Sequence, residues 1–267
     1  MKTLNKLRRW KNRTVPLLGI LLICIALIVG LTSVQAGTPA NQNNARNSID
    51  SKLENQVLEI IRKNPGIIRE ALQAEELQKQ QQQQQLKQRF NQEAQKNPSS
   101  VIGNSPVKGA KDQKLLLIEF ADFQCPYCAE AHKILNQYME RNQDKVTLVY
   151  KHYPLTAIHP EAISAAKAAF AAQKQGKFWQ YHDALFEQQD QLGEQLYIEI
   201  AKKLQLDLAQ FNQQRNSKEF VNVLDQDQQM GESLGIQGTP FFFINGETVS
   251  GAVPLPELEK LQRISNQ

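Results

Sequence analysis

Two cysteines, Cys125 and Cys128, are separated only by Pro126 and Tyr127. A thiolate attacks a disulfide, and a second thiol two residues further on can resolve the mixed disulfide that forms. The same spacing also occurs in half of a zinc site. A purely structural disulfide would close a very small loop here and would contribute little stability. Exchange chemistry therefore fits the pair better than a structural disulfide.

The elements around the pair favour a reactive first sulfur. Residues 114–120, KLLLIEF, form an apolar run of strand length, and residues 125–141 carry apolar side chains at helical spacing. Pro126 suits the first turn of that helix, where a backbone N–H is not needed. Cys125 would then lie at the positive end of the helix dipole, which lowers a thiol pKa. The pattern predicts Cys125 as nucleophile and Cys128 as resolving thiol.

Two acidic residues precede the cysteines. Glu119 interrupts the apolar strand, where an ionisable group is costly unless it has a task. We expect its carboxylate to lie below the sulfurs and to shuttle the Cys128 proton during resolution; the alternative is a solvent-facing residue on a sheet edge. Asp122 is interpreted as a turn or cap residue.

A second segment, GIQGTPFFFI, lies more than a hundred residues downstream. Thr239-Pro240 precedes an apolar strand, the place where a strand tolerates proline. A cis peptide is compatible with this position, although the spacing alone does not require one. We expect residues 241–243, three phenylalanines, to be core strand rather than peptide-binding surface.

A metal-binding interpretation would need further ligands for the cysteines. The nearby histidines are His132, His152 and His159, and none supplies the second ligand pair that structural zinc sites use. We expect His132 to face solvent on its helix. The sequence also carries no nucleotide or flavin motif, so it predicts no metal and no cofactor.

The elements after the cysteines complete the domain. Residues 146–155 alternate as a strand, residues 157–236 are almost entirely helical in pattern, INGE marks a hairpin after Phe243, and residues 255–264 form a last helix. The order is typical of an α/β domain with a small sheet and a helical insertion.

FADFQCPYC, the helical run with GKFWQYHDALF, and GIQGTPFFFINGE with GAVP together resemble the DsbA-like thiol–disulfide oxidoreductases of the thioredoxin superfamily. The resemblance covers residues 115–264. It implies a thioredoxin fold with an inserted helical domain and a redox-active disulfide between Cys125 and Cys128. Glu119 matches the family's buried acid.

The resemblance also implies where substrate binds. Thr239-Pro240 would be cis, would pack against the sulfurs and would offer backbone groups to a substrate peptide, beside Pro126 and Tyr127. The Pro-Tyr dipeptide departs from the Pro-His of the strongest oxidants, and Thr before Pro also occurs in isomerase-like members. Oxidase, isomerase and reductase directions therefore stay open.

The N-terminus predicts export. Residues 1–36 combine a basic stretch, the uncharged run 15–31 and VQA, in the order of a secretory signal. The segment is either cleaved after Ala36 or kept as an anchor through residues 15–34. Cys24, within the apolar run, is interpreted as an apolar filler. An extracytoplasmic location, periplasmic or in the cell envelope, suits a disulfide catalyst.

Between leader and domain, residues 37–50 are predicted as a linker, 51–96 as a helical Gln-rich extension, and 97–113 as a second linker before the domain of residues 114–267. Asn64-Pro65 marks the start of a second helix within the extension. The extension is either a solvated spacer or a stalk that joins copies of the chain.

Charge excludes one class of partner. Six of the 31 Lys and Arg residues lie in the leader, which leaves 25 basic residues against 27 acidic ones. This near-neutral body has no basic patch for nucleic acid. The predicted partners are unfolded or partly oxidised exported proteins and a membrane redox protein. A non-catalytic thioredoxin-like scaffold is the main alternative, and a metal-binding module is a weaker one.

Overall fold

The computed structural model describes residues 42–244 and 246–264. The described residues divide into two units, with the boundary after Arg69. The predicted leader, with Cys24 and the run 15–34, lies outside the described residues. Among the helices that are described, none is both long and apolar enough to cross a membrane.

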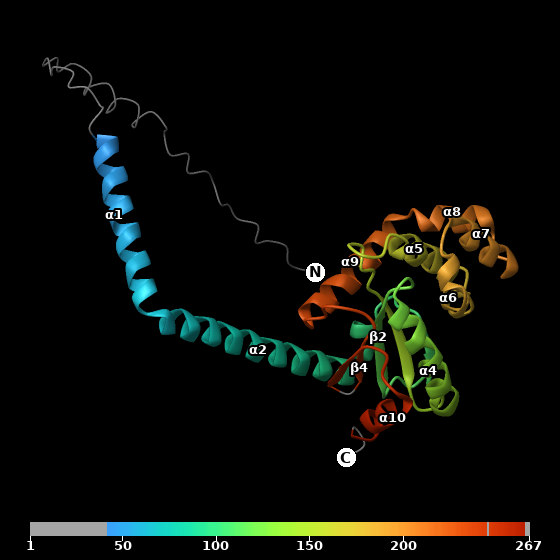
Figure 1. The fold of residues 1–267 in the computed structure, drawn as a ribbon. Coiled ribbons are helices and arrows are strands. Elements are labelled where there is room, and N and C mark those ends of the chain that lie inside the picture. Colours follow the sequence, from blue (N-terminus) through green and yellow to red (C-terminus); the bar gives the residue numbers. More distant parts are fainter. Residues whose placement is uncertain (1–41, 245, 265–267) are drawn as a thin grey trace, which may run out of the picture. The chain divides into compact units, whose positions relative to one another are not determined.

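A five-stranded sheet forms the centre of the second unit, in the order β1-β3-β2-β4-β5 (Figure 1). Its strands are β1 Val107–Gly109, β2 Leu116–Ala121, β3 Thr147–His152, β4 Phe241–Ile244 and β5 Glu247–Ser250. The β2–β3 pair is parallel and the other three pairs are antiparallel. Helix α4, Pro126–Asn142, connects the two parallel strands, as a parallel crossover requires.

Helices cover both faces of the sheet. One face packs Leu117, Leu148 and Phe242 against α4 and against α10, Leu255–Ile264. The other face packs Ile118, Val149 and Phe243 against the end of α2, Pro65–Lys96, and against α3, Pro98–Ile102. Successive residues of β2 point to opposite faces, so Glu119 shares the face of Leu117, below α4.

The insertion between β3 and β4 is helical, as predicted, and lies beside one end of the sheet (Figure 1). Its first helix is rich in alanine and packs tightly against the helices that follow. The hydrophobic core that these helices form also contains the two cysteines. The α-helices are α5 Ala162–Gln173, α6 Phe178–Glu187, α7 Glu194–Lys203, α8 Leu208–Arg215 and α9 Lys218–Ser233, with a 3-10 turn η1 at Gln189–Gln191. The fold is therefore the predicted thioredoxin fold with an inserted helical domain.

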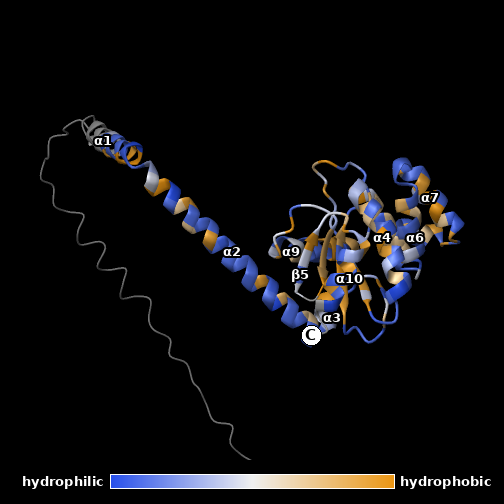
Figure 2. Cartoon of the chain, turned by 60° about the horizontal axis from the view of Figure 1, so that its bottom comes forward, coloured by the Kyte–Doolittle hydropathy of each residue, from blue (hydrophilic) through white to orange (hydrophobic). Residues whose placement is uncertain are grey.

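The N-terminal extension is helical, with α1 at Gln42–Lys63 and α2 at Pro65–Lys96. The helix break falls at Asn64-Pro65, as predicted. Residues 42–50, predicted as linker, are already helical, because no Gly or Pro interrupts them. Figure 2 shows that α2 is mostly hydrophilic, in contrast to the hydrophobic strands of the sheet.

The segment 97–113, predicted as a linker, instead supplies α3 and β1, and β1 pairs with β3 at the sheet edge. The end of α2 also belongs to the second unit. Phe90 meets Phe243 edge to face with ring centroids 4.6 Å apart, and Ala94 is buried. Short polar stretches can thus carry ordered structure when a neighbouring sheet satisfies their backbone groups.

Candidate active site

The cysteine pair lies where β2 ends and α4 begins. Cys125 occupies the extended residue before the helix, and Pro126 takes the first helical position. The carbonyl of Cys125 accepts backbone hydrogen bonds from Cys128 at 3.0 Å and from Ala129 at 3.2 Å. Both cysteines are free thiols and both are buried. The structure therefore describes the reduced form of the pair.

The two sulfurs have opposite electrostatic surroundings. Hydrogen bonds lower the pKa of Cys125 from 9.0 to about 5, although burial opposes the shift. The largest contribution comes from the Cys128 side chain, and smaller ones come from Thr239 and from the backbone N–H groups of Cys128 and Tyr127. Burial and the neighbouring Cys125 raise the pKa of Cys128 well above its ordinary value. At neutral pH Cys125 is a thiolate and Cys128 a thiol, the states that the predicted roles of nucleophile and resolving thiol require.

The segment before β4 completes the surroundings of Cys125. The Thr239-Pro240 peptide is cis. The Cys125 sulfur lies 3.3 Å from the Thr239 carbonyl oxygen, so the two predicted motifs meet in space. A pocket of about 320 Å³ lies beside them, lined by Thr239, Pro240, Phe241 and the neighbouring glycines. Backbone groups in such a pocket are available to an extended peptide.

Glu119 is buried in the middle of β2, between Tyr150 of β3 and Phe242 of β4. Neither carboxylate oxygen has a hydrogen-bond partner among the described residues. Burial raises its pKa from 4.5 to about 8, although the positive charge of Lys108 opposes the shift. The group can therefore gain or lose a proton near neutral pH, which its predicted shuttle role requires.

Asp122 is the turn residue that the sequence predicts, and it also does more. Its Oδ1 accepts from the Gln124 backbone N–H at 2.8 Å, which is a local turn. Its Oδ2 accepts from the Leu155 backbone N–H at 2.8 Å and lies 2.7 Å from Nδ1 of His159. Asp122 thus ties the loop before the cysteines to the segment after β3.

Gln189 of η1 makes a second connection to the loop before α4, and no sequence pattern predicts it. Its Nε2 donates to the carbonyls of Phe123 and Cys125, both at 2.8 Å. A glutamine among many others in a polar stretch carries no pattern, so only the fold identifies it. Through this side chain the helical insertion holds the backbone on which the nucleophile sits.

Tyr127 lies on the surface beside the buried sulfurs, with 62% of the residue exposed. Ile158, in the segment after β3, is 68% exposed. The prediction that Pro126 and Tyr127 contact substrate is not tested by these positions, but an exposed aromatic ring is available there for a partner.

The prediction that His132 faces solvent is wrong. His132 is 5% exposed, because it lies one helical turn after Cys128 and shares its inward face. Its ring stacks on Phe186 and meets His182 edge to face. Lys108, which lies in the predicted linker 97–113, also approaches this region and donates to Asn136 at 3.2 Å.

Comparisons with known proteins place this geometry in a family. The sequence model of the DSBA-like thioredoxin domain matches residues 116–262, more than half of the 267-residue chain. The structure resembles a thioredoxin-like oxidoreductase from Silicibacter pomeroyi DSS-3, with TM-score 0.59 and 28% identity over 64% of this chain and 98% of that one. ScsC from Proteus mirabilis gives TM-score 0.56 and 25% identity over 82% of this chain and 97% of that one.

A curated relative has a different description. The Na(+)/H(+) antiporter NhaA 3 of Salinispora tropica is 36% identical over 145 residues, 54% of this chain. The match spans only 22% of that antiporter's length, so the likeness concerns one segment of the relative.

Proposed function

Because the chain belongs to the DSBA-like thioredoxin domain family, we propose that it exchanges disulfides with other exported proteins through the Cys125-Pro-Tyr-Cys128 pair. The observation that carries the proposal is the contrast between the two sulfurs. Cys125 has a pKa of about 5, and Cys128 is held as a thiol by burial. The sulfur of Cys125 is therefore the one that reacts with substrate.

In the oxidising direction, the pair starts as a disulfide. A substrate thiolate attacks the sulfur of Cys125, the Cys125–Cys128 bond breaks, and the departing Cys128 sulfur takes a proton from the carboxylic acid of Glu119. A second substrate thiolate then attacks the substrate sulfur of the mixed disulfide and releases Cys125 as a thiolate. The substrate loses two electrons and the cysteine pair gains them.

In the opposite direction, the Cys125 thiolate attacks a substrate disulfide and releases one substrate thiolate. Cys128 then gives its proton to the Glu119 carboxylate and attacks Cys125, which frees the second substrate thiol. The low pKa of Cys125 stabilises the reduced pair and so supports oxidation of substrates as the favoured direction.

The decisive experiment compares two single variants in exchange with a reduced, unfolded substrate protein. We expect Cys125→Ser to lose all exchange activity. Given a substrate protein that contains a disulfide, Cys128→Ser should still react at Cys125 but should accumulate mixed disulfides, because the resolving thiol is missing. Wild-type activity in Cys125→Ser would overturn the proposal, and absence of exchange activity in the wild type itself would favour the scaffold alternative.

The direction is tested in cells by acid trapping, followed by alkylation with a mass-tagging reagent. A mostly oxidised pair supports an oxidase that a membrane oxidant recharges. A mostly reduced pair supports an isomerase or reductase that receives electrons across the membrane.

Export is part of the proposal and rests on the leader sequence. Mass spectrometry of the mature N-terminus distinguishes cleavage after Ala36 from an anchor retained through residues 15–34. An intact N-terminus in a protein that fractionates with cytoplasmic markers would contradict an extracytoplasmic location.

The exposed apolar residues of α1 and α2 support self-association through residues 51–96. They are Leu53, Val57, Leu58, Ile60, Ile61, Ile67, Ile68, Leu72, Leu77 and Leu86. We expect the double variant Leu53→Glu/Ile60→Glu to sediment as a smaller species than the wild type. The control Asn55→Glu/Gln56→Glu adds the same charge to polar positions of α1 and should leave the sedimentation unchanged. Equal sedimentation of all three proteins would favour the spacer interpretation.

A further inference from the structure

Two helices bring two imidazoles and one carboxylate together beside α4. His132 comes from α4, and His182 and Asp183 come from α6. Each offers one ligand atom, and these atoms lie within 4.8 Å of one another. Within residues 42–244 and 246–264, this is the one group of at least three such side chains that are close enough to hold a metal ion, and it contains neither cysteine.

We propose that His132, His182 and Asp183 form a binding site for a divalent transition-metal ion of the zinc class. Nδ1 of His132 lies 3.8 Å and Nδ1 of His182 lies 2.9 Å from the same Oδ1 of Asp183. Zinc bonds nitrogen and oxygen ligands at about 2.0–2.2 Å, so ligand atoms in a tetrahedral shell lie roughly 3.3 Å apart. The two distances bracket that separation, and small side-chain movements would admit the ion.

The chemistry of the ligand set suits this class of metal. Two imidazoles and a carboxylate bind zinc and its neighbours in the transition series, whereas magnesium and calcium prefer oxygen alone. Imidazole binds a metal ion through a ring nitrogen in its neutral form. Three protein ligands leave the fourth position for water.

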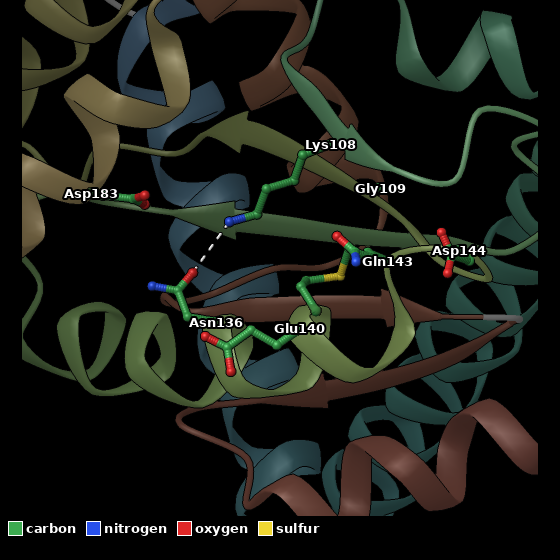
Figure 3. Close-up of a pocket in the computed structure, with 8 residues that line it drawn as sticks. Lys108, Gly109, Asn136, Glu140, Gln143, Asp144 and Asp183 are labelled. Atoms are coloured by element: carbon green, nitrogen blue, oxygen red, sulfur yellow. Dashed lines mark hydrogen bonds between the residues drawn. The ribbon is translucent and has the colours of Figure 1, made fainter. Parts of the chain in front are cut away.

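Access to the site comes from a cleft of about 530 Å³. Asp183 lines it together with Lys108, Asn136, Glu140 and Asp144 (Figure 3). The Asp183 side chain is 37% exposed, while those of the two histidines are at most 6% exposed. An ion entering the cleft would meet the carboxylate first and the imidazoles behind it.

The Lys108 ammonium group competes with the metal ion for the proposed site. Figure 3 shows its side chain extending toward Asn136 and Asp183, and its Nζ donates to Oδ1 of Asn136. The Asn136 amide nitrogen then faces Nε2 of His132 at 3.2 Å, so Nε2 accepts and Nδ1 carries the proton. A metal on Nδ1 requires that proton on Nε2 and a flipped Asn136 amide, which no longer accepts from Lys108. Metal binding and the Lys108–Asn136 bond are therefore mutually exclusive.

A purely structural role would explain the burial of the histidines, because both rings lie among Phe123, Phe186 and other aromatic side chains. The two interpretations differ at Asp183 and Lys108. A structural hydrogen bond from His182 survives when Asp183 becomes asparagine, because the amide oxygen still accepts. A metal site loses its only anionic ligand in that variant.

The test uses untagged wild-type protein with Cys125 and Cys128 oxidised to the disulfide, so that no thiolate competes for the ion. After treatment with a chelator, the protein is titrated with Zn²⁺ by calorimetry and with Co²⁺ by visible absorption. We expect one ion of each per chain and cobalt bands of a tetrahedral site. Asp183→Asn should bind zinc at least about tenfold more weakly. Lys108→Gln should bind it more tightly, because a repelling charge is removed.

The matched control is Asp144→Asn, which removes a carboxylate from the same cleft outside the ligand group and should leave the affinity unchanged. Unaltered thermal unfolding of the metal-free variants shows that each is folded. Equal zinc affinity in Asp183→Asn and wild type, or no saturable binding by the wild type, would overturn the proposal. Because no exchange activity is measured, failure of the metal site is separate from failure of the proposed function.

Discussion

Glu119 and Asp122 are buried carboxylates three residues apart in one segment, yet their surroundings differ completely. Asp122 accepts two backbone N–H groups and meets the His159 ring, whereas neither oxygen of Glu119 has a partner among the described residues. A partnered carboxylate stabilises the fold as an anion, and an unpartnered one destabilises it in that form.

This difference in hydrogen bonding distinguishes a buried acid that stabilises the fold from one that can take part in a reaction. Asp122 fixes the loop that presents the cysteines, and its charge does not need to change. Glu119 has no hydrogen bond among the described residues that would hold it in one protonation state, as the proposed proton transfer with Cys128 requires.

The largest effect is expected from Glu119→Gln, measured by urea unfolding of the disulfide form at several pH values. The pKa of Glu119 is about 8 in the folded chain against 4.5 in the unfolded chain. The folded state therefore holds the extra proton, and its stabilising effect is fully present below pH 4.5 and lost as pH rises to 8. Wild type should lose up to about 1.4 kcal/mol per pH unit relative to Glu119→Gln in this range.

The same variant should resolve mixed disulfides more slowly at neutral pH, by a factor on the order of 10², because Cys128 loses its proton acceptor. A variant that is more stable at pH 8 but slower in resolution would confirm that Glu119 serves chemistry. Parallel pH curves for the two proteins would show that Glu119 is not the titrating group.

A smaller effect is expected from Asp122→Ala at pH 7. The backbone N–H groups of Gln124 and Leu155 lose their acceptor, and the His159 ring loses its partner. The free energy of unfolding should fall by about 3 kcal/mol, and Asp122→Asn should recover part of it. A loss below about 1 kcal/mol would mean that water replaces the carboxylate and that the contrast with Glu119 is weak.

The smallest effect is expected from Gln189→Ala. The carbonyl of Cys125 keeps its bonds from Cys128 and Ala129, so unfolding should change by only about 1 kcal/mol. The matched control is Gln188→Ala, because the Gln188 amide donates to the Ala184 carbonyl of α6 and not to the loop that carries the cysteines. If Gln189→Ala alone alters the thiol pKa of Cys125 by alkylation kinetics, the insertion positions the nucleophile.

The sequence predicted what depends on local pattern. A strand, a cysteine pair and a proline in the first helical turn are neighbours in the chain, so the place of Cys125 follows from them. The hairpin after β4 and the last helix have equally local signals. Glu119 was identified as a candidate functional residue because an ionisable side chain is costly in an apolar strand.

What the sequence could not predict depends on contacts between distant segments. β1 is three residues long and is ordered only because β3 pairs with it, so a polar stretch looked like a linker. His132 was placed on the wrong side because α6, which buries it, lies fifty residues away. Gln189 and Lys108 have no local pattern, and only the folded chain brings them to the site.

The contact between Cys125 and Thr239 also has a consequence for protein synthesis. The two residues are separated by 114 positions, so a ribosome finishes the whole helical insertion after it has made the cysteines and before it makes Thr239. During that interval the nascent chain lacks the carbonyl that lies 3.3 Å from the Cys125 sulfur in the folded domain. The surroundings of the reactive sulfur can therefore be completed only late in synthesis, after the whole helical insertion has been made.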